Sequence, residues 1–329
     1  MDDAIRAACA GIFALAGRNA VATVMPRRKD IWRCGLVARP IESVLAEGGI
    51  HGPVIWLPEE PPFQFLADPF GWRDADGRLH VFAEHYDYRR RHGTIVSLVY
   101  NDALRLVDRR PCLSAPWHLS YPQVFAGEGA VWMLPEAHRS GGLTLYRTHD
   151  GLADWRAECR IDLDCVPVDA SILRHDDRWW LFYAPADSKT TKLSHLHVAS
   201  AERLTGPWTP HPGNPVRIDP RSARPGGAPV VIGDRIMLPV QDNSATYGGA
   251  LRPLWIDRLD EGHVQVIAGE ALAPPDGVGA YGHGMHTLSA CGDITLFDVK
   301  RIDTSLSGLT LDIRPMTASH RRSSSVRPR

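Results

Sequence analysis

Apolar and polar positions follow the same order in five stretches of the chain. The first, FLADPFGWRDADGRLHVFAEH, runs from Phe65 to His85, and the others begin at Ser120, Val168, Arg224 and His283. Each has a polar or Gly/Pro-rich entry, a short apolar run, a tight turn and a second apolar run that ends in polar residues. Two apolar runs joined by such a turn predict a β-hairpin.

The turns contain residues that tolerate left-handed backbone torsions. They recur about 50 to 60 residues apart, at Asp76-Gly77, Glu128-Gly129, Asp176-Asp177, Gly233-Asp234 and Gly292-Asp293. Each turn is followed by further strand-like runs, such as TIVSLVY, LTLYRTH, SHLHVAS, PLWIDRL and LTLDIRP. Four strands per repeat predict an all-β fold, a five-bladed β-propeller of four-stranded blades. A two-sheet sandwich is the alternative, and the fixed period favours the propeller.

This organisation predicts three segments. Residues 1–28 are expected to form a short N-terminal extension, partly helical or loose, and residues 29–317 the propeller. The run IWRCGLVARP, near the N-terminus, is expected to complete a terminal blade and close the ring. Residues 318–329, which include the run SHRRSSSVRPR, are expected to be a disordered basic tail.

Composition narrows the class of protein. A net charge of -1 gives no sign of a nucleic-acid partner. Six cysteines without a CxxC spacing indicate neither a disulfide framework nor a zinc site, and no metal or cofactor is expected. The N-terminus begins with acidic residues, and Arg6 and Arg18 interrupt its apolar stretch, so neither a signal peptide nor a membrane span is expected. We therefore expect a cytoplasmic protein.

Propeller geometry converts the repeat into a predicted site. The first strand of a blade begins at the same face at which the second ends. The first strands begin with Asp68, Tyr121, Asp169, Arg224, His283 and His286, and the second end with Glu84, Glu136, Gln241, Asp242, Asp298 and Lys300. Carboxylates, imidazoles, an arginine and an aromatic ring around one opening predict a polar pocket suited to a sugar.

Each of these residues also has a simpler interpretation. Asp68 precedes Pro69 and could be a turn residue, although its alignment with Asp169 favours a role in the site. Glu84 and Glu136 could be solvated rim residues, and the two histidines of HGMH are more typical of hydrogen-bond donors than of metal ligands. Arg224 could bind a carboxylate or phosphate of the ligand, or form an internal salt bridge with Asp68 or Asp169.

Two family resemblances follow from these residues. FLADPF and VDASILRHDDRWWLFYA resemble the furanosidase-type propellers of glycoside hydrolase family 43, which implies Asp68 as general base and Asp169 as the residue that tunes the acid and orients substrate. A nearer resemblance, through ADPFGW, LSYPQVF, VWMLPEA, SARPGG and PVQDNSATYGG, is to the N-terminal propeller domain of glucosamine inositolphosphorylceramide transferases and their bacterial relatives. In plant members this domain adjoins a glycosyltransferase domain, which implies a separate glycosyltransferase as a candidate partner.

One departure from the hydrolases affects the chemistry. Their general acid is a glutamate that opens the fourth blade, where this chain has Arg224-Pro225-Gly226-Gly227. Arginine does not give up its proton near neutral pH. Glu136 is therefore the provisional acid, with Glu84 as a second candidate and Asp242 behind them.

The predicted function is an action on a glycoside or glycoconjugate, by hydrolysis or glycosyl transfer, with Asp68, Asp169 and Glu136 as catalytic residues. The ligand-binding set is Glu84, Tyr121, Arg224, Gln241, Asp242, His283, His286 and Lys300. The expected ligand is a carbohydrate, a glycoconjugate or a nucleotide-sugar. The alternative is a non-catalytic sugar-binding module of a glycan or glycolipid biosynthesis system.

Overall fold

The computed structural model describes residues 20–24, 28–304 and 309–313. The chain forms two compact units, residues 30–302 and residues 1–29 together with 303–329. In the latter, β1 (Ala20–Val24) pairs antiparallel with β23 (Leu309–Ile313), which contains most of the run LTLDIRP. Most of the predicted N-terminal extension and the whole predicted tail lie outside the described residues, so the boundaries at 28 and 317 stay predictions.

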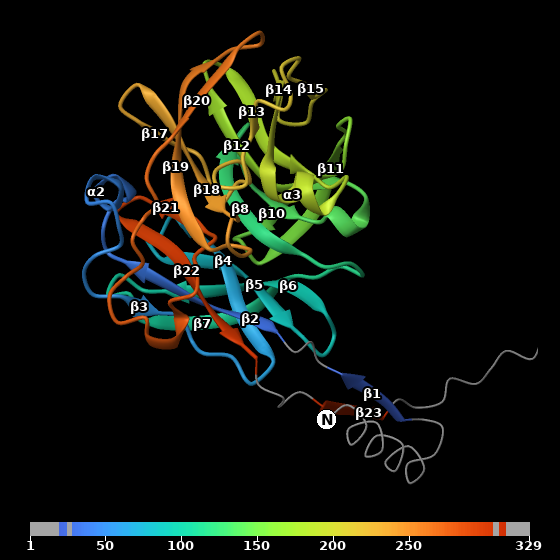
Figure 1. The fold of residues 1–329 in the computed structure, drawn as a ribbon, viewed down its shortest axis with the longest axis vertical. Coiled ribbons are helices and arrows are strands. Elements are labelled where there is room, and N and C mark those ends of the chain that lie inside the picture. The colour runs from blue at the N-terminus through green and yellow to red at the C-terminus, as the bar shows by residue number, and fades with distance from the viewer. Residues whose placement is uncertain (1–19, 25–27, 305–308, 314–329) are drawn as a thin grey trace, which may run out of the picture. The chain divides into compact units, whose positions relative to one another are not determined.

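Residues 30–302 form a five-bladed β-propeller, as the repeat predicts (Figure 1). Blade 1 contains β4 (Gln64–Arg73), β5 (Leu79–Asp87), β6 (His92–Tyr100) and β7 (Leu106–Leu113). Blade 2 contains β8 (Ser120–Gly127), β9 (Ala130–Glu136), β10 (Leu143–Asp150) and β11 (Asp154–Ile161). Blade 3 contains β12 (Pro167–His175), β13 (Arg178–Pro185), β14 (His195–Ala201) and β15 (Thr209–Pro210), and β16 (Arg217–Ile218) also pairs with β14.

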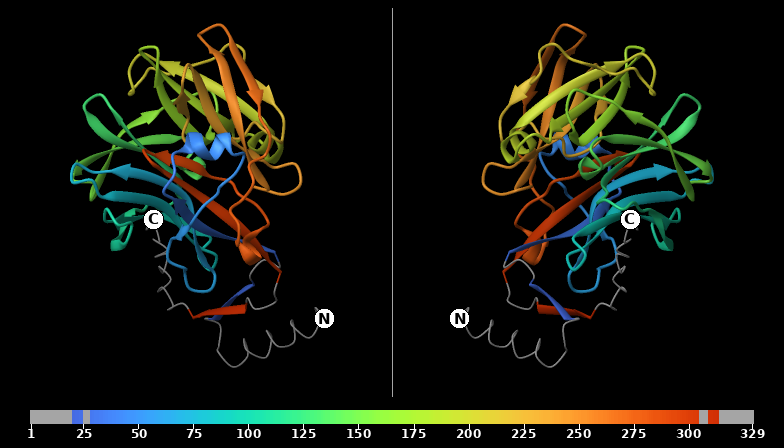
Figure 2. Two further views of the ribbon diagram at one scale, coloured as in Figure 1. Left: turned by 90° about the vertical axis from the view of Figure 1, so that its left-hand side faces the viewer. Right: turned by 90° about the vertical axis from the view of Figure 1, so that its right-hand side faces the viewer.

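The last two blades complete the ring. Blade 4 contains β17 (Val230–Ile232), β18 (Arg235–Asp242), β19 (Ala250–Leu259) and β20 (Val264–Ala268). Blade 5 joins β21 (Leu288–Cys291) and β22 (Ile294–Asp303) to β2 (Lys29–Val37) and β3 (Ile55–Trp56). Figure 2 shows the blue strand β2 beside the red strand β22. The run IWRCGLVARP therefore closes the ring as predicted, and its strand lies third in the blade.

All five predicted turns connect the first two strands of a blade. Positive φ angles occur in each, for example +82° at Gly77, +75° at Gly129 and +60° at Gly292. Asp176 and Asp177 adopt +47° and +59°, which aspartate tolerates better than most residues. The turn residues that predicted the hairpins therefore adopt the left-handed torsions on which the prediction relied.

The hydrophobic core is divided among the five interfaces between neighbouring blades. Each interface has its own cluster of buried side chains. Trp179 and Trp180 are consecutive in β13 and point to opposite faces of the sheet, since side chains alternate along a strand. Trp179 packs into the cluster between blades 2 and 3, and Trp180 into the cluster between blades 3 and 4. One dipeptide thus anchors blade 3 to both neighbours.

Two short α-helices interrupt the strands in the described part of the chain. Helix α2 (Ile41–Ala46) lies between β2 and β3, and α3 (Lys189–Ser194) lies between β13 and β14. A capping box starts α3, because the Ser188 side chain accepts from the Thr191 N–H and the Thr191 hydroxyl accepts from the Ser188 N–H. None of the helices in the described ranges combines the length and apolar character that crossing a bilayer requires.

Candidate functional site

The first strands of blades 1, 2 and 3 share one backbone distortion. Asp68, Tyr121 and Asp169 have φ angles of +50°, +47° and +48°. In each blade the pairing of the first two strands shifts register at this residue. A left-handed residue other than glycine costs about 1 kcal/mol or more, and such bulges re-aim side chains at functional sites. The repetition at three equivalent positions therefore marks this end of the blades as a candidate site.

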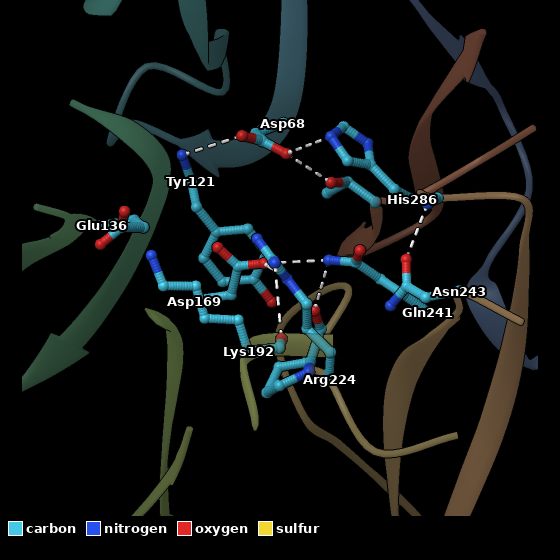
Figure 3. Close-up of polar contacts among 12 residues, drawn as sticks. Asp68, Tyr121, Glu136, Asp169, Lys192, Arg224, Gln241, Asn243 and His286 are labelled. Atoms are coloured by element: carbon cyan, nitrogen blue, oxygen red, sulfur yellow. Dashed lines mark hydrogen bonds and ion pairs between the residues drawn. The ribbon is translucent and has the colours of Figure 1, made fainter. Parts of the chain in front are cut away.

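Asp68 lies at the centre of a group of hydrogen-bond donors (Figure 3). Its Oδ1 accepts a 2.7 Å hydrogen bond from Oγ1 of Thr287 and lies 3.4 Å from Nε2 of His286. Its Oδ2 accepts from the backbone N–H of Tyr121 at 3.1 Å. Burial raises the pKa of Asp68 to about 6, although His286 and Thr287 act in the opposite direction. The carboxyl thus titrates close to neutral pH.

His286 is held by Asp298. Its Nδ1 lies 2.7 Å from Oδ2 of Asp298, and its backbone N–H donates to Oδ1. The imidazole stacks on Trp32, with ring centroids 3.6 Å apart. Burial alone would lower the pKa of His286, but Asp298 and Asp68 together raise it. The imidazole thus lies between two carboxylates, which favour its charged form.

The possibility of a metal centre can be tested on the same residues. Asp68, His286 and Asp298 have potential ligand atoms close enough to share an ion. Yet Asp298 already accepts the backbone N–H groups of Asp68, His286 and Thr287. A carboxylate has about four lone-pair sites, so these three donors leave Asp298 only about one for a metal. The contacts fit a hydrogen-bonded network better than a metal centre.

Asp169 forms a second group with residues of blade 4. Its Oδ2 accepts from Nε of Arg224 at 2.7 Å and from Nε2 of Gln241 at 2.9 Å. Arg224 also lies over the ring of Tyr247, 5.1 Å from its centroid. Of the two interpretations left open above, the internal salt bridge with Asp169 is therefore the one that the structure shows. No hydrogen bond within the described ranges engages the other carboxyl oxygen, Oδ1.

Glu84 and Glu136 occupy matching positions in blades 1 and 2. Glu84 lies opposite Ala67, and Glu136 opposite Ser120, each just before the left-handed residue. Glu136 accepts a 2.6 Å hydrogen bond from the backbone N–H of His138 and also contacts its ring. Glu84 accepts no hydrogen bond from the described residues, and burial raises its pKa well above the ordinary value.

The side chains of the other predicted residues make their contacts away from the carboxylates of Asp68 and Asp169. The Tyr121 hydroxyl binds Ser171 and the backbone N–H of Gly227, so this side chain joins blades 2, 3 and 4. Asp242 is held by Arg252 and Ser244. His283 is exposed and its ring bonds the carbonyl of Ala280. Lys300 is fully buried, where its ammonium binds the carbonyl of Tyr247 and lies 5.2 Å from the Trp32 ring centroid.

Several residues near these groups carried no signal in the repeat. Thr287 donates a hydrogen bond to Asp68, and Trp32 stacks on His286. The ring of Tyr247 lies under Arg224. Lys192, on α3, extends its side chain between Glu136 and Asp169 in Figure 3. Tyr247 belongs to the stretch PVQDNSATYGG that carried the family resemblance, and that stretch was the one available sign of it.

The chain is similar in sequence to known proteins. The family described as "Glucosamine inositolphosphorylceramide transferase 1, N-terminal" matches residues 57–271. The protein of that name from Oryza sativa subsp. indica is 31% identical over 202 residues, which are 60% of this chain and 27% of the rice protein. The protein of the same name from Arabidopsis thaliana is 30% identical over 210 residues, which are 61% of this chain and 26% of that protein. The chain thus spans about a quarter of the length of these curated relatives.

Solved structures of glycoside hydrolases share the fold. The catalytic domain of the Coprinopsis cinerea GH62 α-L-arabinofuranosidase superposes with a TM-score of 0.54, at 14% identity, over 76% of this chain and 96% of the other. CoXyl43, a GH43 β-xylosidase/α-arabinofuranosidase from a compost metagenome, gives 0.51 at 13% identity, over 74% and 92%. Zg3597, a family 117 glycoside hydrolase of Zobellia galactanivorans, gives 0.50 at 13%, over 74% and 86%. At these identities the likeness concerns the fold.

Proposed function

Because the chain belongs to the family of N-terminal domains of glucosamine inositolphosphorylceramide transferase 1, we propose that it acts on a glycosidic bond at the cluster around Asp68 and Asp169. The observation that carries this proposal is the repeated left-handed bulge, which places Asp68 and Asp169 at equivalent points of two blades. Structural strain of this kind is typical of active sites.

The two carboxylates have contacts suited to different roles. Asp68, with a pKa of about 6, is ionised near neutral pH and can accept a proton from a water molecule that attacks the anomeric carbon. Asp169 is fixed by Arg224 and Gln241, which leaves Oδ1 to accept a hydrogen bond from a sugar hydroxyl. The glycosidase-like propellers named above share the fold that presents such groups.

A non-catalytic sugar-binding module remains the second candidate function. The observation that favours it is the fourth blade, where the hydrolases' acid is replaced by Arg224, which is paired with Asp169. Such a module would present the same hydrogen-bonding groups to a glycan and leave the chemistry to a separate glycosyltransferase. A ligand would then bind without turnover.

Turnover of chromogenic substrates tests the proposal. The substrates are chosen from the names of the relatives and are the 4-nitrophenyl α-L-arabinofuranoside, β-D-xyloside and α-D-glucosaminide. We expect hydrolysis of at least one, and a fall in kcat of about 100-fold or more in D68N without a lower melting temperature. D76N, which alters an exposed turn residue of the same hairpin, is the matched control and should retain full turnover. Equal rates in D68N and the wild type would refute the role of Asp68.

A further inference from the structure

Blade 1 carries a second carboxyl group, that of Glu84, beside Asp68. Hydrogen-bond donors surround Asp68, whereas Glu84 accepts no hydrogen bond from the described residues. We propose that Glu84 is the proton donor of the site, an assignment that rests on the proposed function. Glu84 lies in β5 opposite Ala67, so it is next to Asp68 across the pair of strands. The position is the one that Glu136 occupies in blade 2.

Hydrogen bonding distinguishes the two glutamates. Glu136 receives the backbone N–H and the ring of His138, and its side chain is 4% exposed. Both carboxyl oxygens of Glu136 are therefore already engaged by His138. Glu84 has no such donor among the described residues, and its side chain is 8% exposed, the same fraction as Asp68. Glu84 is thus the carboxyl that can keep a proton and still reach a ligand.

The one imidazole near Glu84 does not supply a positive charge. Nε2 of His118 lies 3.5 Å from Oε1 of Glu84, too far for a hydrogen bond. Nδ1 of His118 accepts the backbone N–H of Gly93 at 2.9 Å, which leaves the ring proton on Nε2. Burial, with nearby Arg139, His138 and His92, lowers the pKa of His118 to about 4. His118 is therefore neutral near pH 7.

The charges that act most strongly on Glu84 are those of acids, and Arg139 acts on its neighbours Tyr86 and His118. The carboxylates lie on four other strands of the ring and are those of Asp68, Asp169, Asp298 and Glu136. The phenol of Tyr86 lies two residues further along β5. Burial is the largest cause of the raised pKa of Glu84, and the four carboxylates add to it. Like charges cannot all ionise at close range, so the acid without donors retains its proton.

Asp68 and Glu84 therefore form a pair in which Asp68 is the base and Glu84 is the acid. Thr287, His286 and the Tyr121 N–H stabilise Asp68 as an anion. Among the described residues, the one ion-pair partner of Glu84 within 4 Å is His118, which is neutral. Two carboxyls whose environments separate their pKa values are the arrangement by which glycosidases divide acid and base roles. The arrangement replaces the glutamate that the fourth blade lacks.

The step balances as follows. The Glu84 proton passes to the glycosidic oxygen as its bond to the anomeric carbon breaks, so the leaving group departs as a neutral alcohol. A water oxygen bonds to the anomeric carbon and transfers its proton to Asp68. The proton on Asp68 then exchanges through solvent to Glu84, and the net reaction consumes one water and gives two hydroxyl compounds.

The leaving group provides a specific test. With the aryl glycoside that the wild type hydrolyses, E84Q should lower kcat/KM on the 4-nitrophenyl substrate by about 100-fold. It should change the rate on the 2,4-dinitrophenyl analogue by less than about 3-fold, because that phenolate leaves without a proton. The matched variant E136Q should change both rates by the same factor. An E84Q defect that is equal for the two leaving groups would overturn the assignment.

A second measurement does not depend on turnover. Infrared difference spectra of wild type minus E84Q, recorded at about pH 7, should contain the C=O band of a protonated carboxyl. A difference spectrum with only carboxylate bands would overturn the proposal whether or not the protein hydrolyses a glycoside. A protonated Glu84 in a protein that hydrolyses none of the panel would refute the proposed function and the transfer step with it.

Discussion

Arg224 donates a 2.7 Å hydrogen bond from Nε to Oδ2 of Asp169, and both side chains are about nine-tenths buried. The pair joins the first strand of blade 3 to the segment that opens blade 4. The resemblance to family 43 hydrolases implies that their acid would open the fourth blade where this chain has Arg224. Arg224 thus acts in this structure as the partner of Asp169.

Removal of this arginine should destabilise the protein. R224A leaves a buried carboxylate with Gln241 as its remaining side-chain donor, and loss of one partner of a buried ion pair costs about 3 kcal/mol. R235A, which breaks the half-exposed pair of Arg235 with Asp257, should cost less than about 1 kcal/mol. Urea denaturation of both variants measures the two losses. Equal losses would mean that the Asp169 pair contributes no more than a surface pair.

The buried carboxyl of Asp68 should make stability depend on pH. Its pKa of about 6 in the folded protein exceeds the ordinary value of about 4, so the folded state binds this proton more tightly than the unfolded chain. The resulting stabilisation is complete below about pH 4 and is lost as the pH rises through about 6. The free energy of unfolding of wild type relative to D68N should therefore fall over this interval. A difference that is constant with pH would show that the Asp68 pKa is not raised.

Close approach of blades 4 and 5 should make Gly227 irreplaceable. Its φ is +156°, and a Cβ there would lie 1.8 Å from the carbonyl oxygen of Leu288. We expect G227A to lower the free energy of unfolding by at least about 3 kcal/mol. The control G233A, at a turn with φ of +63° and no atom within 4 Å of the added Cβ, should lose about 1 kcal/mol. Similar losses in the two variants, measured by thermal or urea denaturation, would contradict this account.

The sequence predicts the architecture well because the hairpin signals are local. Gly77, Gly129 and Asp176 lie at the predicted turns, and alternation along β13 accounts for the two cores that Trp179 and Trp180 enter. The repeat also indicates which end of the blades carries the polar residues. Such inferences need only the spacing and order of residues along the chain.

The partners within the site could not be predicted in the same way. Thr287 lies 219 residues from the Asp68 that it contacts, and whether Arg224 would pair with Asp68 or Asp169 depends on the angle between blades. His283 and His286 are three residues apart, yet the first is exposed and the second is buried against Trp32. Periodicity describes each strand and contains no information on how far a neighbouring blade is rotated.

The most direct test of the central claim is a crystal structure of D68N soaked with the aryl glycoside that the wild type turns over. We predict density for the sugar at the cluster around residue 68, with a hydroxyl on Oδ1 of Asp169 and the glycosidic oxygen within hydrogen-bond distance of Glu84. A sugar bound elsewhere on the propeller, or none at saturating concentration, would contradict the claim.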